Sequence, residues 1–237
     1  VQTAVTNMIS YKSGLVGIET AKSNLGLANI EYTVAQAKLL AGTGTNIELL
    51  NAKEKVLSKE KEVKDAQSES NTLLKKLQVM TGWSYDASPQ VGELPMPDIN
   101  REFNPNADLD EAIKNNYSLR INEKKLGNAK SQSDRDTLET TIADNKAHIA
   151  TSLTVASQNI TAAKGNYNYA AEFAKLQENN LSIANQRYNL GLISKSELET
   201  QKFTTQNSKD SLIRTQYALL QAIVNYDFAV KGLASVS

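Results

Sequence analysis

Few residues of this 237-residue chain are of a type that does catalytic chemistry. The chain has no cysteine, which excludes disulfide and thiolate–metal chemistry, and His148 is its single histidine. A lone histidine on a helix is far more often a surface or seam residue than a general base or a ligand. No glycine-rich phosphate loop follows a strand, and no motif brings two acids together. We therefore expect no enzyme activity, no catalytic residue, no metal and no cofactor.

The polar residues with the most informative spacing are two glutamates that follow glycine turns. Glu48 comes six residues after Gly42, and Glu197 comes six residues after Gly191. A leucine follows each glutamate directly, and Thr or Ser stands three residues before it. The two sites are therefore equivalent, and a carboxylate that recurs around a symmetric assembly forms a ring that favours cations.

Long helices must position these two turns. Proline is excluded from helix interiors at about 3 kcal/mol, and here all the prolines fall in one short stretch. They are Pro89, Pro95, Pro97 and Pro105. Residues that are mostly apolar or small recur at alternating spacings of three and four from Tyr11 to Leu39 and from Leu49 to Met80, with Lys59 in the second series, which indicates coiled-coil packing. A short Gly/Thr turn joins these two helices, so they form an antiparallel hairpin.

A shift of 149 residues superposes the second half of the chain on the first. Residues 38–53 match residues 187–202 in their basic residue, glycine, glutamate, leucine and lysine. This pattern predicts a tandem duplication of one long hairpin.

The predicted fold is all-α, with two tandem long antiparallel coiled-coil hairpins joined by an irregular proline-containing linker. The first hairpin repeat covers 1–82, the linker 83–106, and the second repeat, a short helix plus a long hairpin, 107–237. We expect the short helix to begin near Asp108 or Asp110, and the long helix after it to begin at a capping box of Asp136 and Glu139.

Composition narrows the possible partners. Basic and acidic groups number 26 each, and a net charge of zero lacks the electrostatic footprint of a nucleic-acid binder. No run of 18 apolar residues is present, so no transmembrane helix is expected. Trp83, at the end of the first repeat, either plugs the end of its helix or anchors an interface.

Residues 180–232, which begin NLSIANQRYNLGLISKSELETQ, and their weaker copy in the first repeat resemble the TolC-like outer-membrane efflux proteins. The resemblance covers nearly the whole chain. It implies a homotrimer in which each protomer gives two hairpins to a hollow α-helical barrel in the cell envelope, outside the cytoplasm. It also implies a duct of a tripartite efflux or type I secretion system, whose hairpin tips meet a periplasmic adaptor (membrane fusion) protein and, through it, an inner-membrane transporter.

The same resemblance assigns roles at the tips. The expected adaptor-binding residues are Gly42, Thr43, Gly44, Thr45, Leu49, Gly191, Leu192, Ile193, Ser194 and Leu198. The expected duct entrance consists of Glu48, Glu197 and Tyr188, and Tyr188 matches a family tyrosine that hydrogen-bonds the acid of the other hairpin. We therefore expect a Tyr188–Glu48 contact, in a carboxylate ring that lacks the second acidic position because Asn51 and Thr200 stand there. Leu192 and Ile193 either meet a partner or pack across their own hairpin.

Two departures from the family pattern set further expectations. The family places two membrane β-strands in each repeat, yet residues 127–137 are charged and do not alternate, so we expect no strand there and membrane contact only through segments outside this sequence. Residues 107–149 have no counterpart before Val1, so the first repeat is expected to be incomplete at its N-terminus. The alternative function is an elongated helical-bundle structural or spacer protein of the envelope with no transport role.

Overall fold

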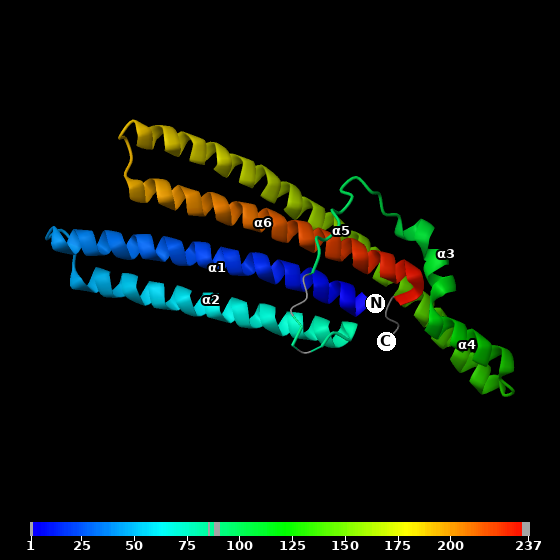
Figure 1. The fold of residues 1–237 in the computed structure, drawn as a ribbon. Helices are drawn as coiled ribbons and strands as arrows, with labels where there is room; N and C mark the ends of the chain where they lie inside the picture. Colours follow the sequence, from blue (N-terminus) through cyan, green and yellow to red (C-terminus); the bar gives the residue numbers. More distant parts are fainter. Residues whose placement is uncertain (1, 85, 88–90, 234–237) are drawn as a thin grey trace. The chain divides into compact units, whose positions relative to one another are not determined.

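The computed structural model describes residues 2–84, 86–87 and 91–233, and this described part contains helices and no strand. The helices are α1 (Gln2–Leu40), α2 (Asn46–Thr81), α3 (Pro105–Asn115), α4 (Tyr117–Asn128), α5 (Gln132–Asn189), α6 (Lys195–Phe228) and a π-helical turn, η1 (Ala229–Leu233) (Figure 1). The predicted all-α class is confirmed. Pro89 and its neighbours 85, 88 and 90 in the predicted linker lie outside the described residues.

The chain forms two compact units: the first combines segments from both predicted repeats, whereas the second consists of the end of the linker and segments of the second repeat. Unit 1 consists of residues 1–94 and 167–217, and unit 2 consists of residues 95–166 and 218–237. The tandem duplication and the boundaries of its two repeats stay a prediction. The two compact units do not test them, because the units reflect contacts in space and not order along the chain.

Unit 1 holds the hairpin of α1 with α2 and the adjoining parts of α5 and α6. Lys55 of α2 pairs with Glu31 of α1, and Lys209 of α6 pairs with Glu178 of α5. The helices approach closely because small residues fill their contacts: a Cβ on Gly26 of α1 would stand 2.6 Å from Cε1 of Phe203. Other buried small residues are Ala21, Ala28, Ala170 and Ala174.

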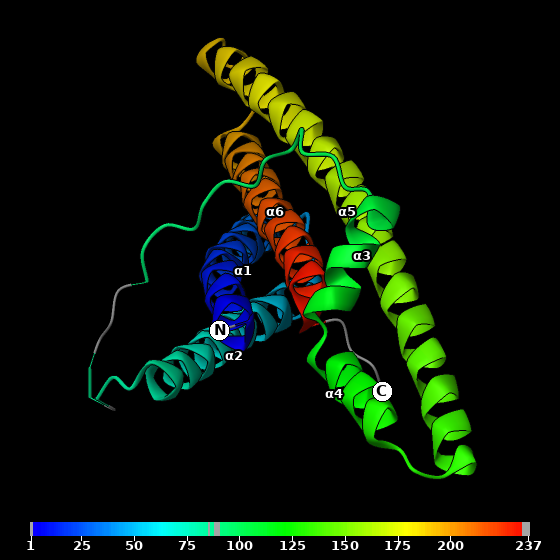
Figure 2. The same cartoon turned by 90° about the vertical axis from the view of Figure 1, so that its right-hand side faces the viewer.

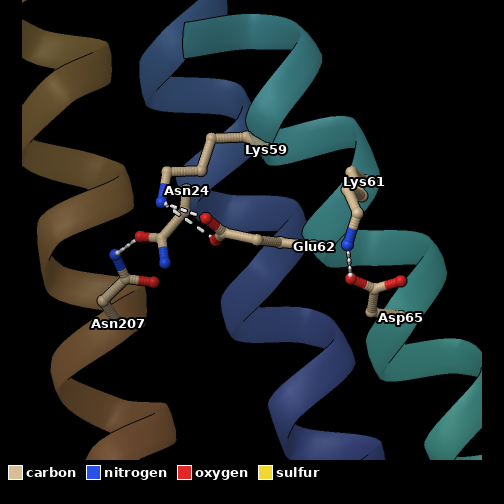
Figure 3. Close-up of polar contacts among 6 residues, drawn as sticks. All are labelled: Asn24, Lys59, Lys61, Glu62, Asp65 and Asn207. Atoms are coloured by element: carbon tan, nitrogen blue, oxygen red, sulfur yellow. Dashed lines mark hydrogen bonds and ion pairs between the residues drawn. The ribbon is translucent and has the colours of Figure 1, made fainter.

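The contact between α1 and α6 is markedly polar. The Asn207 side chain donates to Asn24 Oδ1 at 2.9 Å (Figure 3). The Thr20 hydroxyl donates to the buried carboxylate of Asp210 at 3.3 Å, and Gln206 donates to the same carboxylate at 2.8 Å. Buried polar groups in helix seams fix register, because a shift of either helix leaves them without partners.

In unit 2, aromatic and charged side chains attach the segment before α3 to the last turns of α6. Tyr226 is fully buried, donates to Asp108 at 2.5 Å and meets the ring of Phe103 edge-on at 5.0 Å. The Arg101 guanidinium lies over that Phe103 ring and donates to both carboxylate oxygens of Asp227. Burial raises the pKa of Tyr226, and Asp108 raises it further, so the phenol stays protonated as the donor.

Two predicted helix starts were wrong, and each has a local cause. The short helix begins at Pro105 rather than at Asp108 or Asp110, because Asn104 accepts from the Ala107 N–H and proline fits the first turn. It also breaks into α3 and α4, since buried Asn116 caps α4 by accepting from the Leu119 N–H.

The long helix α5 begins at Gln132, before the predicted capping box at Asp136. The Ser131 hydroxyl accepts from the Asp134 N–H at 3.1 Å and caps the helix one turn earlier. By contrast, the predicted stop at Gly82 is confirmed, with Gly82 at φ 73°.

The structure gives the exposure of two residues that the sequence singled out, His148 and Trp83. His148 is exposed on α5, and Trp83, just after the end of α2, is 43% exposed, so both expected roles of Trp83 stay predictions. Within the described residues, none of the helices combines the length and the apolar character that a bilayer span needs.

Candidate functional site at the hairpin tips

The first tip closes α1 with a glycine in the left-handed region. Gly42 has φ 70°, and its N–H donates to the Leu39 carbonyl at 3.0 Å. The Thr43 N–H donates to the Lys38 carbonyl at 2.9 Å. These two bonds form the Schellman motif, which satisfies carbonyls at the end of α1 and reverses the chain.

The second tip repeats this geometry at the end of α5. Gly191 also has φ 70°, its N–H donates to the Tyr188 carbonyl at 2.9 Å, and the Leu192 N–H donates to the Arg187 carbonyl at 2.8 Å. An L side chain is strained at this φ, so each tip requires its glycine. The equivalence inferred from the sequence therefore extends to the backbone.

Both descending helices begin with a capping box, a role that the sequence reasoning missed. The Glu48 N–H donates to the Thr45 hydroxyl at 3.2 Å, and the Thr45 N–H donates to the Glu48 carboxylate at 2.8 Å. Ser194 and Glu197 make the same pair of bonds, at 3.2 and 2.8 Å. The Thr/Ser-x-x-Glu spacing was the available signal.

The capping hydrogen bonds lower the pKa of both glutamates. The Thr45 N–H, followed by its hydroxyl, holds the pKa of Glu48 below the ordinary value. The Ser194 N–H and hydroxyl lower the pKa of Glu197 in the same way. Both side chains are exposed, so each tip presents one carboxylate at the start of its descending helix.

The tips differ at the position after the Schellman turn. A Cβ on Gly44 would stand 2.9 Å from Cβ of Lys38, and the Gly44 N–H gives a further bond to the Lys38 carbonyl at 3.0 Å. The second tip has the half-buried Ile193 at the equivalent position. The first turn is therefore too tight for a side chain that the second turn accommodates.

Apolar side chains remain uncovered at both tips. Leu192 is 64% exposed, Ile193 and Leu49 are half-buried, and Leu198 is buried, so contact of Leu192 and Ile193 with a partner stays a prediction. The sequence reasoning missed four further exposed side chains near the tips. They are Leu40, Ile47, Leu50 and Leu190.

The expected Tyr188–Glu48 pair is not joined by a hydrogen bond in the described structure. Glu48 uses its carboxylate on Thr45, and Tyr188 is 38% exposed. The closing role of Tyr188 therefore stays a prediction for an assembled state.

A groove of about 500 Å³ runs along unit 1 beside the tips. Its lining includes Ile30, Val34 and Ala52, together with the ion pair of Lys55 with Glu31 at 2.6 Å. A second, more apolar hollow of about 420 Å³ adjoins it along α1 and the start of α6. The described residues contain no group of three or more side chains able to hold a metal ion.

The likeness of this chain to known proteins is found in its structure and not in its sequence. No family model matches the chain, and no curated protein matches its sequence. CusC, known from crystal structures concerned with folding and transmembrane channel formation, matches with a TM-score of 0.65 at 13% identity, over 99% of this chain and 78% of CusC.

Two further solved structures match in the same way. The CmeC outer membrane channel of Campylobacter jejuni has a TM-score of 0.61 at 14% identity, over 98% of this chain and 62% of CmeC. A membrane protein from Pseudomonas aeruginosa has a TM-score of 0.60 at 12% identity, over 97% of this chain and 67% of that protein. The chain thus has the fold of the helical part of TolC-like outer-membrane efflux channels, and it spans under two thirds of CmeC.

Proposed function

We propose that this chain is the duct component of a tripartite export system in the cell envelope. Three copies would close their helical layers into one conduit, and the hairpin tips would dock on a periplasmic adaptor protein that connects the duct to an inner-membrane transporter. The observation that carries this proposal is the pair of equivalent tips, both in unit 1 and both built from a Schellman turn followed by a capping box. The fold shared with efflux channels supports it.

In this proposal the tips bind the adaptor through an exposed leucine side chain that lies near a charged glutamate. Leu192 is exposed at the second turn, and Glu197 remains charged one helical turn further on. A partner that covers Leu192 gains the burial of a leucine side chain, about 1.5–3 kcal/mol for full burial. The rigid turn holds that leucine in place before binding, so little ordering entropy is lost.

The test is capture of the tagged periplasmic adaptor of the same cell by purified chain. Leu192→Asp should reduce capture at least tenfold, because a charge replaces an exposed apolar contact without disturbing the chain's own packing. Tyr117→Ser, at an exposed position of α4, serves as the matched control and should capture like the natural chain. Unchanged capture by a folded Leu192→Asp variant would refute tip docking.

A second measurement concerns export itself. Cells that lack the protein should accumulate a fluorescent efflux dye, and the natural gene, but not the Leu192→Asp gene, should restore its export. A cell in which both genes restore export equally would contradict the proposed role of the tips.

A further inference from the structure

A cleft of about 490 Å³ lies within unit 2, between α5 and the segment that leads into α3. Figure 2 shows that segment running beside α5. One wall of the cleft consists of residues 101–105. The other wall is a single face of α5, because its residues are spaced by three, one and three: Ser157, Ile160, Thr161 and Lys164. The hairpin tips belong to unit 1, so this cleft has no part in the site described above.

The two cations that line the cleft differ in their partners. Arg101 donates to both carboxylate oxygens of Asp227, at 3.0 and 2.5 Å, so its charge is compensated. Lys164 is half-buried and has no ion pair or hydrogen bond with any other residue that the structure describes. An ammonium that loses part of its water without gaining a counter-ion costs free energy. The cleft therefore favours a ligand that brings an anionic group to Lys164.

Two neutral hydrogen-bond donors stand in the same cleft. The Ser157 hydroxyl has no partner among the described residues. Asn104 uses its side-chain oxygen to accept from the Ala107 N–H at 3.2 Å, and within the described part of the chain its amide NH₂ is left to donate elsewhere. Hydroxyl and amide donors suit ligand oxygens that carry no charge. A ligand that satisfies the cleft thus has several oxygens, one group of which is ionised.

The cleft also has an apolar part, formed by Phe103 and Ile160. Ile160 is 4% exposed, and the Phe103 ring is held in place by the Arg101 guanidinium at 4.6 Å and by the edge-on ring of Tyr226 at 5.0 Å. Sites for small organic ligands have volumes of about 300–1000 Å³ and combine apolar walls with a few placed polar groups. An inorganic anion alone would leave the apolar part and most of the volume unfilled.

We propose that this cleft binds an acidic sugar, a monosaccharide unit that carries a carboxylate. Its carboxylate pairs with Lys164, its ring hydroxyls accept from Ser157 and Asn104, and its C–H face packs on the apolar part. Glu102 also lines the cleft and is exposed, without an ion pair to Lys164 in the described structure. Because like charges repel, Glu102 limits the affinity for the ligand carboxylate. This proposal does not depend on the duct function.

The test is an NMR titration of the purified chain with two matched sugars, glucuronate and glucose. The two differ only at C6, which is a carboxylate in glucuronate and a hydroxymethyl group in glucose. We expect saturable shifts of the backbone amides of residues 157–164, with glucuronate binding at least tenfold tighter than glucose, as a charged hydrogen bond provides. Inorganic phosphate, the third probe, should bind more weakly than glucuronate because it reaches only the ammonium.

Variants of one side chain separate the site from general charge. Lys164→Gln should weaken glucuronate binding at least tenfold and leave glucose binding unchanged, whereas Lys164→Arg should keep the preference for glucuronate. Lys114→Gln is the matched control, because Lys114 is an exposed lysine of α3 outside the cleft lining, and it should bind like the natural chain. Glu102→Gln should bind glucuronate several-fold tighter. The circular dichroism spectrum and melting temperature verify that each variant is folded.

Each outcome decides the proposal. A preference for glucuronate that is lost in Lys164→Gln and kept in Lys164→Arg and Lys114→Gln supports it, whatever adaptor capture shows. Equal binding of the two sugars, phosphate that binds as tightly as glucuronate, the same loss in Lys164→Gln and Lys114→Gln, or no saturable binding would overturn it. Binding by Glu102→Gln alone would also overturn it, because an internal ion pair would then neutralise the natural cleft.

Discussion

The close approach of α1 to α6 at Gly26 gives a quantitative prediction about the free energy of unfolding. Alanine in place of glycine in an exposed helix interior stabilises a helix by about 1 kcal/mol. At Gly26 the added Cβ would overlap the ring of Phe203, and overpacking of this kind costs about 1–3 kcal/mol. At Gly17, on the same helix, an added Cβ meets nothing within 4 Å.

The difference between Gly26→Ala and Gly17→Ala therefore isolates the packing against Phe203, since the helix-propensity gain is common to both. We expect Gly17→Ala to raise the free energy of unfolding by about 1 kcal/mol, and Gly26→Ala to fall about 1–3 kcal/mol below it. For a chain of this size the gap corresponds to roughly 2–12 °C in melting temperature.

The assay is urea unfolding followed by circular dichroism, repeated with the double variant Gly26→Ala/Phe203→Leu. The smaller leucine should recover part of the loss, because it vacates the space that the new methyl group takes. If the two alanine variants are equally stable, the contact of Phe203 with Gly26 does not hold α1 against α6.

Two further predictions concern capping and the buried tyrosine. Tyr226→Phe removes the donor to Asp108 and should lower the free energy of unfolding by about 1–3 kcal/mol, measured by thermal melting; an unchanged melting temperature would contradict this bond. Glu197 should titrate below its ordinary pKa of 4.5 by carboxyl NMR, so its capping contribution is complete above that pH and is lost as the pH falls through the lowered pKa. Ser194→Ala should return the pKa of Glu197 toward the ordinary value, and a Glu197 pKa that is the same in both proteins would refute this cause.

The long helices were predictable because their signal is local and repeated many times. The spacing that places Ala21, Ala28 and Leu77 on seams matches their burial, and proline and glycine mark where the hairpin helices end. The break at Asn116 was missed because its cause is tertiary. Its side chain caps α4 and also donates to the carbonyl of Gly232, which is more than a hundred residues away.

The candidate site was predictable in its positions but only partly in its chemistry. The repeat identified Glu48 and Glu197 as equivalent, and the structure adds that each carboxylate serves first as a helix cap. Exposure separates Leu192 from Leu198, although both were grouped as tip residues. That separation depends on where each side chain falls around its own hairpin, which residue type alone does not determine.

Exposed apolar side chains on α2 and α5 bear on the choice between a duct and a self-contained bundle. They are Leu50, Leu57, Leu176 and Ile183. A bundle that is complete in one chain would bury such side chains against each other. In unit 1, α1 and α6 stand between these helices, and α1 and α6 hold each other through polar pairs such as Asn24 with Asn207, which fix their register. Exposed apolar side chains therefore remain on both outer helices of unit 1. These exposed apolar side chains favour the proposed duct over the alternative of a spacer protein, because a contiguous exposed apolar surface marks an interaction site.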